Sequence, residues 1–214
     1  MPLQNRVTPL GELVRSPARG TMMGNRGGRI HDNETRTLLR RRWANRRWIV
    51  CVTEFRGRRR RVMQPNRYTE LFFLDEATAF AAGHRPCFEC RNQRAKEFAS
   101  AFFDGLEFEK TGADAMDAIL HEERCLSGTG TVLLTADAVR SLPRGTLFAA
   151  GDACVAVGTD ALWLWHIDGY QALPADWLDA KTHDPGRLRL LTPPSTVAAL
   201  RAGYRVQMHP SAGA

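Results

Sequence analysis

Apolar residues recur along the chain at two spacings, and each spacing predicts a different kind of element. Ala95, Phe98 and Phe102 recur every three to four residues, which indicates a helix with one buried face. On this basis the predicted helices cover residues 33–45, 76–82, 91–103, 111–124, 137–142 and 194–203. Asp75 and Gly83 bound the second of these, because aspartate caps a helix N-terminus and glycine readily ends a helix.

Short runs rich in β-branched and aromatic residues predict strands. The strongest is residues 46–55, which have the sequence RRWIVCVTEF. Glycines at positions 27 and 28 predict a hairpin between residues 21–24 and 29–31. Further strands are predicted at residues 60–64, 68–74, 132–134, 147–149, 153–157, 162–166 and 187–191. The segments 153–157 and 162–166 are separated by a short glycine-containing turn, so we expect them to pair as a second hairpin.

Together these elements predict an α+β fold. Residues 21–110 are predicted to form an N-terminal domain of β-hairpins and short helices, and residues 111–205 a domain with a small antiparallel sheet and helices. The polar stretch 104–111 is the predicted connection between them. Residues 1–20, with three prolines and no period, predict an extended basic arm, and residues 206–214 predict a flexible tail.

The positive charge of the chain is concentrated in its first third. The net charge is +7 over 214 residues, but residues 1–67 hold 17 arginines against four acidic residues, which gives +13. The remaining residues therefore carry −6, so the second domain is mildly acidic. Such asymmetry predicts a polyanion as the partner of the N-terminal part. Arginine is also suited to phosphate, because its guanidinium contacts two oxygens at once.

The composition is that of a globular protein, with 43% hydrophobic residues. No apolar run approaches the roughly 20 residues of a membrane span, and the N-terminus lacks a signal-peptide core. Five cysteines, an odd number, fit a reducing compartment better than a disulfide framework. The sequence therefore predicts a cytoplasmic protein without membrane partners, and it leaves the oligomeric state open.

Cys87 and Cys90 are separated by two residues and follow a glycine and a proline. A CxxC pair in a tight turn points both thiolates to one side, and this spacing most often binds a metal ion in an intracellular protein. The helical spacing that follows places Cys90 at the N-terminus of a helix, where the positive end of the helix dipole favours the thiolate. Zinc is the predicted cofactor.

Residues 69–91, TELFFLDEATAFAAGHRPCFECR, resemble the second half of the Ada-type zinc-binding domain. In that family a strand ending in paired aromatics leads to a short helix and then to a segment similar to residues 81–91, AAGHRPCFECR. The resemblance implies a zinc-binding, DNA-binding domain linked to DNA repair. It covers only this stretch, with a weaker match at residues 48–51, and says nothing of the rest of the chain.

The resemblance also implies a third ligand. Cys51 follows a short apolar strand and matches the family's first cysteine, whereas the second would fall at Phe55, which cannot bind zinc. His31, at the end of a predicted strand beside a glycine turn, is the preferred fourth ligand, completing a site of three cysteines and one histidine. His84 and Glu54 are the alternatives. His84 occupies the family's aromatic position, where packing is the simpler role.

Arginines surround the predicted metal site in the sequence, interleaved with Trp43 and Trp48. They could pair phosphates while the rings stack on bases, although the simpler expectation for both tryptophans is the core. The predicted nucleic-acid contacts are Arg26, Arg41, Arg42, Arg46, Arg47, Arg58, Arg59, Arg60 and Arg61.

Residues 121–125, HEERC, resemble the start of a zinc-protease motif in which the second histidine is replaced by Cys125. His121 and Cys125 lie one helical turn apart and could share a metal, or Glu122 could act as an acid or base. His121 and Glu122 are therefore the candidate catalytic pair. The simpler interpretation is a helix whose charged residues face water.

These observations predict a zinc-containing protein that binds nucleic acid, with DNA favoured over RNA, in which zinc is mainly structural. The alternative is an enzyme acting on nucleic acid, a hydrolase, a glycosylase or a methyl-accepting repair protein, that uses Cys51 or the His121/Glu122 helix. A third possibility is an adaptor whose basic surface binds an acidic protein or ribosomal RNA.

Overall fold

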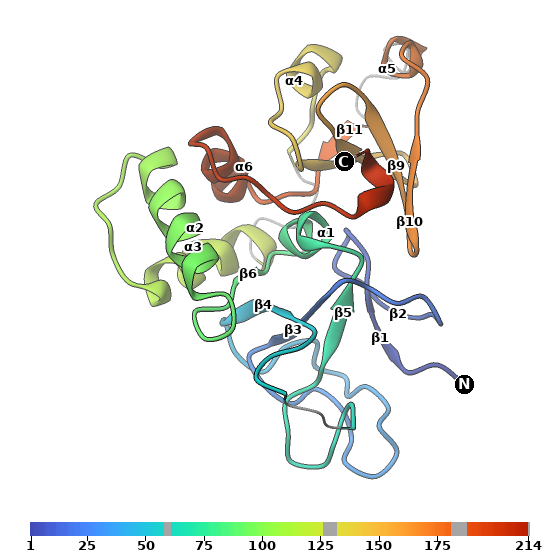
Figure 1. Ribbon diagram of the computed structural model, residues 1–214, viewed down its shortest axis with the longest axis vertical. Helices are drawn as coiled ribbons and strands as arrows, with labels where there is room; N and C mark the ends of the chain where they lie inside the picture. Colours follow the sequence, from blue (N-terminus) through green and yellow to red (C-terminus); the bar gives the residue numbers. More distant parts are fainter. Residues whose placement is uncertain (58–60, 126–131, 181–187, 214) are drawn as a thin grey trace.

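The computed structural model describes residues 1–57, 61–125, 132–180 and 188–213. These residues form an α+β fold with two sheets. In Figure 1 the first sheet lies in the lower half of the molecule, the second in the upper half, and helix α1 (Glu76–Ala81) lies between them. Three further helices gather on the left of the view: α2 (Asn92–Gly105), α3 (Ala113–Cys125) and α6 (Pro194–Arg201).

The first sheet is mixed and has the strand order β2-β1-β5-β3-β4-β6. Its strands are β1 (Gln4–Val7), β2 (Leu13–Arg15), β3 (Met22–Arg26), β4 (Trp48–Val52), β5 (Leu71–Phe73) and β6 (Arg85–Pro86). The pairs β1–β5 and β4–β6 are parallel, and the other pairs are antiparallel. The parallel pairing of β6 with β4 places the CxxC turn beside the strand that contains Cys51.

The second sheet is antiparallel and has the order β10-β9-β8-β7-β11. Its strands are β7 (Leu147–Ala150), β8 (Ala153–Val157), β9 (Leu162–His166), β10 (Gly169–Ala172) and β11 (Leu188–Leu190). The predicted β8–β9 hairpin is confirmed. Two short helices, α4 (Ala136–Arg140) and α5 (Trp177–Ala180), complete this half of the chain, and residues 132–134 form only an isolated bridge at Leu133.

The largest hydrophobic core contains residues from both predicted domains. Phe98 on α2 meets Tyr204 after α6 with ring centroids 5.1 Å apart. Gly105 lies so close to α6 that a Cβ there would come 2.5 Å from the carbonyl oxygen of Ala198. Residues on the two sides of the predicted connection at 104–111 therefore share this core, and a second core lies wholly on the C-terminal side, between Val139 and Val197.

Both chain ends differ from the predictions. Residues 1–20 were expected to be an extended arm, but they contain the β1–β2 hairpin at one edge of the first sheet. The prolines lie outside the two strands, so they do not interrupt the ladder. The expected flexible tail is packed as well: Val206 and Ala212 are 4% exposed, and the amide of His209 donates to Asp75 Oδ2 at 2.9 Å.

The segment between β3 and β4 also differs from the prediction, because residues 33–45 form turns instead of a helix. Asp32 accepts hydrogen bonds from the amides of Glu34 and Thr35, which fixes a local turn. Arg36 then adopts a φ of +56°, which no helix allows. The predicted hairpin over residues 21–31 is absent too, since β3 extends to Arg26 and pairs with β4 and β5.

Two adjacent carboxylates at the start of α1 join this helix to the C-terminal residues. Asp75 caps α1 by accepting from the amide of Thr78, and it also accepts from the hydroxyl of Tyr170 at 2.9 Å. Glu76 is fully buried and pairs with Arg91 at 2.7 Å and with Arg94 at 3.1 Å. The hydroxyl of Tyr204 and the amide of Gln207 donate to the same carboxylate.

We expect Glu76→Gln to lower the free energy of unfolding by about 3 kcal/mol, because the substitution leaves two partly or fully buried guanidinium groups without their counter-charge. Urea unfolding followed by circular dichroism measures this change. Glu109→Gln, at an exposed glutamate, is the matched control and should change stability by less than about 0.5 kcal/mol. Equal effects of the two substitutions would contradict the role assigned to Glu76.

Candidate metal centre and basic surface

Three cysteines, one from strand β4 and two from the turn after β6, meet at one edge of the first sheet. Cys51 lies in β4, and the parallel pairing of β6 with β4 is continued by a 2.9 Å hydrogen bond from the amide of Cys87 to the carbonyl of Val50. Cys90 lies two residues before α2, close to the helix N-terminus as the sequence predicts. The ligand atoms of Cys51, Cys87 and Cys90 all lie within 4.8 Å of one another.

This spacing is suited to a metal ion. In a tetrahedral site with metal–sulfur bonds of about 2.3 Å, neighbouring sulfurs lie about 3.8 Å apart, so small side-chain rotations would bring the three thiols to that geometry. Cys51 and Cys87 are each 7% exposed, and Cys90 is partly exposed. The three cysteines could therefore hold a metal ion.

The turn around Cys87 stabilises negative charge on sulfur. The amide of Glu89 donates to Cys87 Sγ at 3.4 Å, and hydrogen bonds from the thiols of Cys51 and Cys90 lower the pKa of Cys87 well below the ordinary thiol value. The pKa of Cys51 is raised by the same thiol contacts and by burial. A bound cation would favour ionisation of all three thiols.

An ion pair holds the metal turn against α3. Arg85, directly before Pro86 in β6, donates from Nε and Nη2 to the two carboxylate oxygens of Asp117 at 3.0 and 2.8 Å. Both side chains are almost completely buried. A bidentate pair of this kind fixes orientation as well as distance, so α3 sets the position of the segment that leads into Cys87.

The structure does not bring His31 to the three cysteines. Its Nδ1 lies 2.7 Å from Thr69 Oγ1 and its Nε2 lies 3.2 Å from the carbonyl oxygen of Gln64, so both ring nitrogens have protein partners. The expectation that His31 is the fourth ligand is therefore not met. His84 and Glu54, the alternatives, are also outside the cluster: among the described residues the close group of potential ligands contains the three cysteines alone.

His84 has a packing role, as expected for the aromatic position of the resemblance. It is fully buried, with its ring centroid 4.7 Å from that of Phe73 and 5.2 Å from that of Trp48. Burial, together with the positive charges of Arg26 and Arg124, lowers the pKa of His84 far below its ordinary value. The folded protein therefore keeps this imidazole neutral.

A cavity of about 190 Å³ opens beside the three cysteines. Phe55, Tyr68 and Phe72 contribute aromatic wall, and Glu70 and Glu89 contribute carboxylates. A metal ion held by three thiolates would have its fourth coordination position toward water or toward a ligand in this cavity if no further protein group moved in.

His121 and Glu122, the predicted catalytic pair on α3, have different surroundings in the structure. His121 Nδ1 lies 3.5 Å from Cys125 Sγ, so the i, i+4 contact exists, but no third potential ligand joins it among the described residues. Glu122 faces solvent. The neighbouring Glu123 is hydrogen-bonded instead: its carboxylate accepts from the amide and the hydroxyl of Ser195 at the start of α6.

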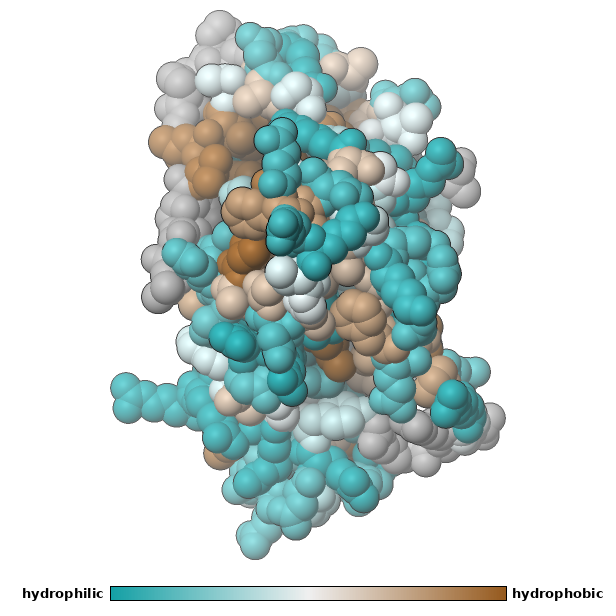
Figure 2. Space-filling view, turned by 90° about the vertical axis from the view of Figure 1, so that its left-hand side faces the viewer, coloured by the Kyte–Doolittle hydropathy of each residue, from teal (hydrophilic) through white to brown (hydrophobic). Residues whose placement is uncertain are grey.

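The segment from residue 40 to residue 47 is exposed throughout and contains five arginines. Arg41 and Arg42 donate to backbone carbonyl groups, and Arg47 pairs with the exposed Asp114 at 3.0 Å. The loops joining β3 to β4 and β4 to β5 lie at the lower end of the molecule in Figure 1, and Figure 2 shows this end covered mainly by hydrophilic side chains. Arg61 is exposed as well, and Arg58, Arg59 and Arg60 lie outside the described residues.

Two tryptophans near this segment have different environments. Trp48 is 5% exposed, as expected for the core, but Trp43 is 42% exposed, which corrects the expectation that both are buried. Arg26, a predicted phosphate contact, is only 3% exposed and stacks on Trp48 with 4.2 Å between its guanidinium carbon and the ring centroid.

Arg124 was not singled out from the sequence, yet it lies over the same Trp48 ring at 4.1 Å. The signal was present in the helical period, because Met116, Leu120 and Arg124 follow one another at four-residue spacing on the buried face of α3. A buried arginine is rare unless it has partners, so its place on this helix face indicates a charge with a specific role inside the fold.

No family model, no curated protein and no solved structure matches this chain. In the described part of the chain, no helix combines the length and the apolar character needed to cross a bilayer.

We expect metal binding to protect three cysteines selectively from alkylation. In the metal-loaded protein, iodoacetamide should modify Cys51, Cys87 and Cys90 slowly, and a chelator should make them reactive, because a coordinated thiolate is a poorer nucleophile than a free one. Cys125 is the internal control, and its reaction rate should not depend on the chelator. Peptide mass spectrometry reads each site separately, and unchanged rates at all five cysteines would contradict a metal centre here.

We also expect stability to fall below pH 6.5 because of His84. Its pKa is lowered in the folded state, so as the pH falls through about 6.5 the unfolded chain binds a proton that the folded protein does not. The loss approaches about 1.4 kcal/mol per pH unit. His84→Phe removes this contribution, so the difference in unfolding free energy between wild type and variant should change between pH 7.5 and 5.5. If the unfolding free energies of wild type and His84→Phe changed equally with pH, the contribution assigned to His84 would be contradicted.

Proposed function

We propose that this is a zinc-containing protein that binds nucleic acid, with DNA as the first candidate. The observation that carries the proposal is the exposed segment 40–47, which holds five arginines and leads directly into β4, the strand that contains Cys51. Its side chains have carbonyl groups or solvent as partners in most cases, so they are available to phosphate.

Zinc is the proposed metal because of the donor set. Cysteine thiolates select zinc, copper(I) or iron–sulfur clusters, and a tight CxxC turn with backbone amides directed at sulfur is typical of zinc. The fourth position would be filled by water or by a group outside the described residues. Zinc in this position links β4, β6 and the start of α2, so its main role in this proposal is structural.

The exposed Trp43 supports a nucleic-acid partner over a protein partner. A large aromatic ring between arginines can stack on a base while the guanidinium groups contact the flanking phosphates. Because backbone contacts dominate the affinity of such surfaces, we expect binding that depends strongly on salt and weakly on sequence.

We expect one zinc ion per chain, measured by elemental mass spectrometry on protein purified without added metal. Cys51→Ser, Cys87→Ser and Cys90→Ser should each lose or weaken this zinc, because two thiolates do not hold it tightly. Cys154→Ser, at a buried cysteine in β8, is the matched control and should retain it. His31→Gln should also retain it, and a zinc-free but folded His31→Gln would return this histidine to the ligand set.

We expect duplex and single-stranded DNA to bind at low salt, with log K falling linearly as log salt concentration rises. Arg41→Gln with Arg46→Gln should reduce the slope for duplex DNA by about two, since each lost phosphate contact removes about 0.9. Arg201→Gln, at an exposed arginine in the other half of the chain, should leave the slope unchanged. Fluorescence anisotropy measures the affinity and its salt dependence. If neither duplex nor single-stranded DNA bound detectably at low salt, the proposal would be refuted.

A second candidate function is a reactive zinc thiolate, favoured by the cavity beside the cysteines. A thiolate bound to zinc can accept a methyl group from a methylated phosphate, forming a thioether and releasing a phosphodiester anion. Incubating the protein with DNA that carries a methyl phosphotriester tests it: a methyl group on Cys51 would support this function. Unmodified cysteines in protein that binds the same DNA would leave zinc with its structural role.

A further inference from the structure

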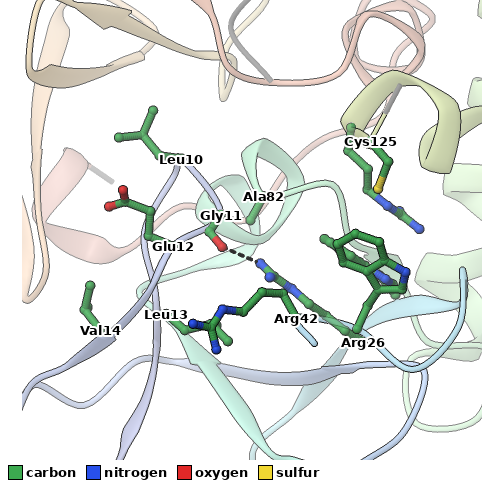
Figure 3. Close-up of a pocket in the computed structure, with 12 residues that line it drawn as sticks. Leu10, Gly11, Glu12, Leu13, Val14, Arg26, Arg42, Ala82 and Cys125 are labelled. Carbon is green, nitrogen blue, oxygen red and sulfur yellow. Dashed lines mark hydrogen bonds between the residues drawn. The ribbon is translucent and has the colours of Figure 1, made fainter. Parts of the chain in front are cut away.

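A second cavity, about 670 Å³ in volume, lies away from the cysteine cluster. Figure 3 shows how it is bounded by residues 10–14, the end of the β1–β2 turn and the start of β2, on one side and by Arg26, Arg42 and Cys125 on the other. Its polar wall consists chiefly of Arg26, Arg42 and Arg124, and its aromatic wall of Trp43 and Trp48. The volume is in the range of small-molecule binding sites.

Arg26 and Arg124 are buried cations without a carboxylate partner. Arg26 is 3% exposed and donates from Nη2 to the carbonyl of Gly11 at 2.8 Å, the bond drawn in Figure 3, while its Nε has no hydrogen-bond partner. Arg124 is 9% exposed and donates to the carbonyls of Gly83 and Arg46, and its Nε also lacks a partner. In the described part of the chain, neither guanidinium forms an ion pair with an acidic residue.

The two cations also repel each other. Both guanidinium carbons lie close over the Trp48 ring, at 4.2 and 4.1 Å from its centroid. Burial first, and then mutual repulsion, lowers the pKa of Arg26 to about 9, and burial lowers the pKa of Arg124 to about 10. Buried like charges are costly unless a counter-ion neutralises them, so this wall favours an anion.

The chain itself supplies little negative charge to the cavity. Glu12 is on the wall, but Figure 3 shows its carboxylate pointing away from the guanidinium groups. The thiol of Cys125 is the other acidic group on the wall, and it lies 3.5 Å from His121 Nδ1. Three guanidinium groups therefore face a cavity that has room for a ligand with several charged oxygens.

The exposed Trp43 ring on the same wall indicates what an anion bound here would carry. Trp43 is 42% exposed and leans on Trp48 with 6.1 Å between ring centroids and a tilt of 47°. Trp43 also meets the His121 ring edge-on at 6.0 Å, so two ring contacts hold it while part of the indole stays accessible. An accessible indole beside a cationic wall is suited to a flat, conjugated group attached to an anion.

We propose that this cavity binds the phosphate of a nucleotide, with the guanidinium groups of Arg26, Arg42 and Arg124 contacting the phosphate and Trp43 stacking on the base. The chemistry is the same for a free nucleotide and for the phosphorylated end of a nucleic-acid strand. The inference shares Arg42 and Trp43 with the surface of the proposed function, but its failure can be told apart, because the arginines substituted there, Arg41 and Arg46, do not line this cavity.

The test is calorimetric titration of the zinc-loaded full chain with inorganic phosphate, adenosine and adenosine 5′-monophosphate (AMP). We expect AMP to bind roughly tenfold more tightly than phosphate, because the base adds a stacking contact, and adenosine to bind more weakly than AMP. AMP should also slow the alkylation of Cys125, which lies on the wall of the cavity. Equal affinity for phosphate and AMP, or no binding of either at low salt, would overturn the proposal.

Variants at exposed positions keep the test independent of folding. Arg42→Gln should weaken AMP roughly tenfold by removing a charge-assisted contact. Trp43→Ala should weaken AMP to the affinity of phosphate and leave phosphate itself unchanged. Arg41→Gln, the adjacent exposed arginine, is the matched control and should bind AMP like the wild type. Wild-type affinity in both Arg42→Gln and Trp43→Ala would overturn the assignment of the site.

Two competitors distinguish the sources of the phosphate. An oligonucleotide with a 5′-phosphate that displaces AMP, when the same oligonucleotide without the phosphate does not, would support a strand end as the ligand. Displacement by neither would support a free nucleotide. Displacement by both at equal concentrations would show that the cavity does not select a phosphorylated end and would overturn the strand-end form of the proposal.

Discussion

The burial of two adjacent carboxylates, Asp75 and Glu76, is the constraint on which the rest of the structure depends. A buried charge is tolerated only with complementary partners, and here the partners come from α2, the second sheet and the chain end. The first turn of α1 therefore specifies where three separate parts of the chain must lie. Because Arg91 is the residue after Cys90, the same network also sets the position of the metal-binding turn.

The pattern of apolar residues was sufficient to predict most of the elements but not their assembly. Helices α1, α2, α3 and α6 and the β8–β9 hairpin follow from periodicity and caps, which depend on neighbouring residues. Segment 33–45 was mistaken for a helix because Leu38 and Leu39 suggested an apolar face that the surrounding arginines do not complete. The terminal residues were mistaken for loose ends because their partners, such as Asp75, lie far away in sequence.

The candidate sites were predictable to the extent that spacing is local. Cys87 and Cys90 form a pair within one turn, and the addition of Cys51 came from a resemblance rather than from spacing. His31 was chosen for its chemistry, and only the fold reveals that Thr69 and the Gln64 carbonyl occupy its ring nitrogens. Net charge indicated a polyanion partner, but it could not separate the exposed arginines of segment 40–47 from arginines that are buried against an indole ring.

The Arg85–Asp117 ion pair has a thermodynamic consequence. Arg85 lies two residues before Cys87, and Asp117 lies about two helical turns before Arg124 on α3, so one helix contacts both the metal turn and the arginine cavity. If occupancy of either site shifts α3, the affinities of the two sites are coupled, and the coupling free energy is the same in both directions. The protein would then report the presence of its metal through its affinity for an anion.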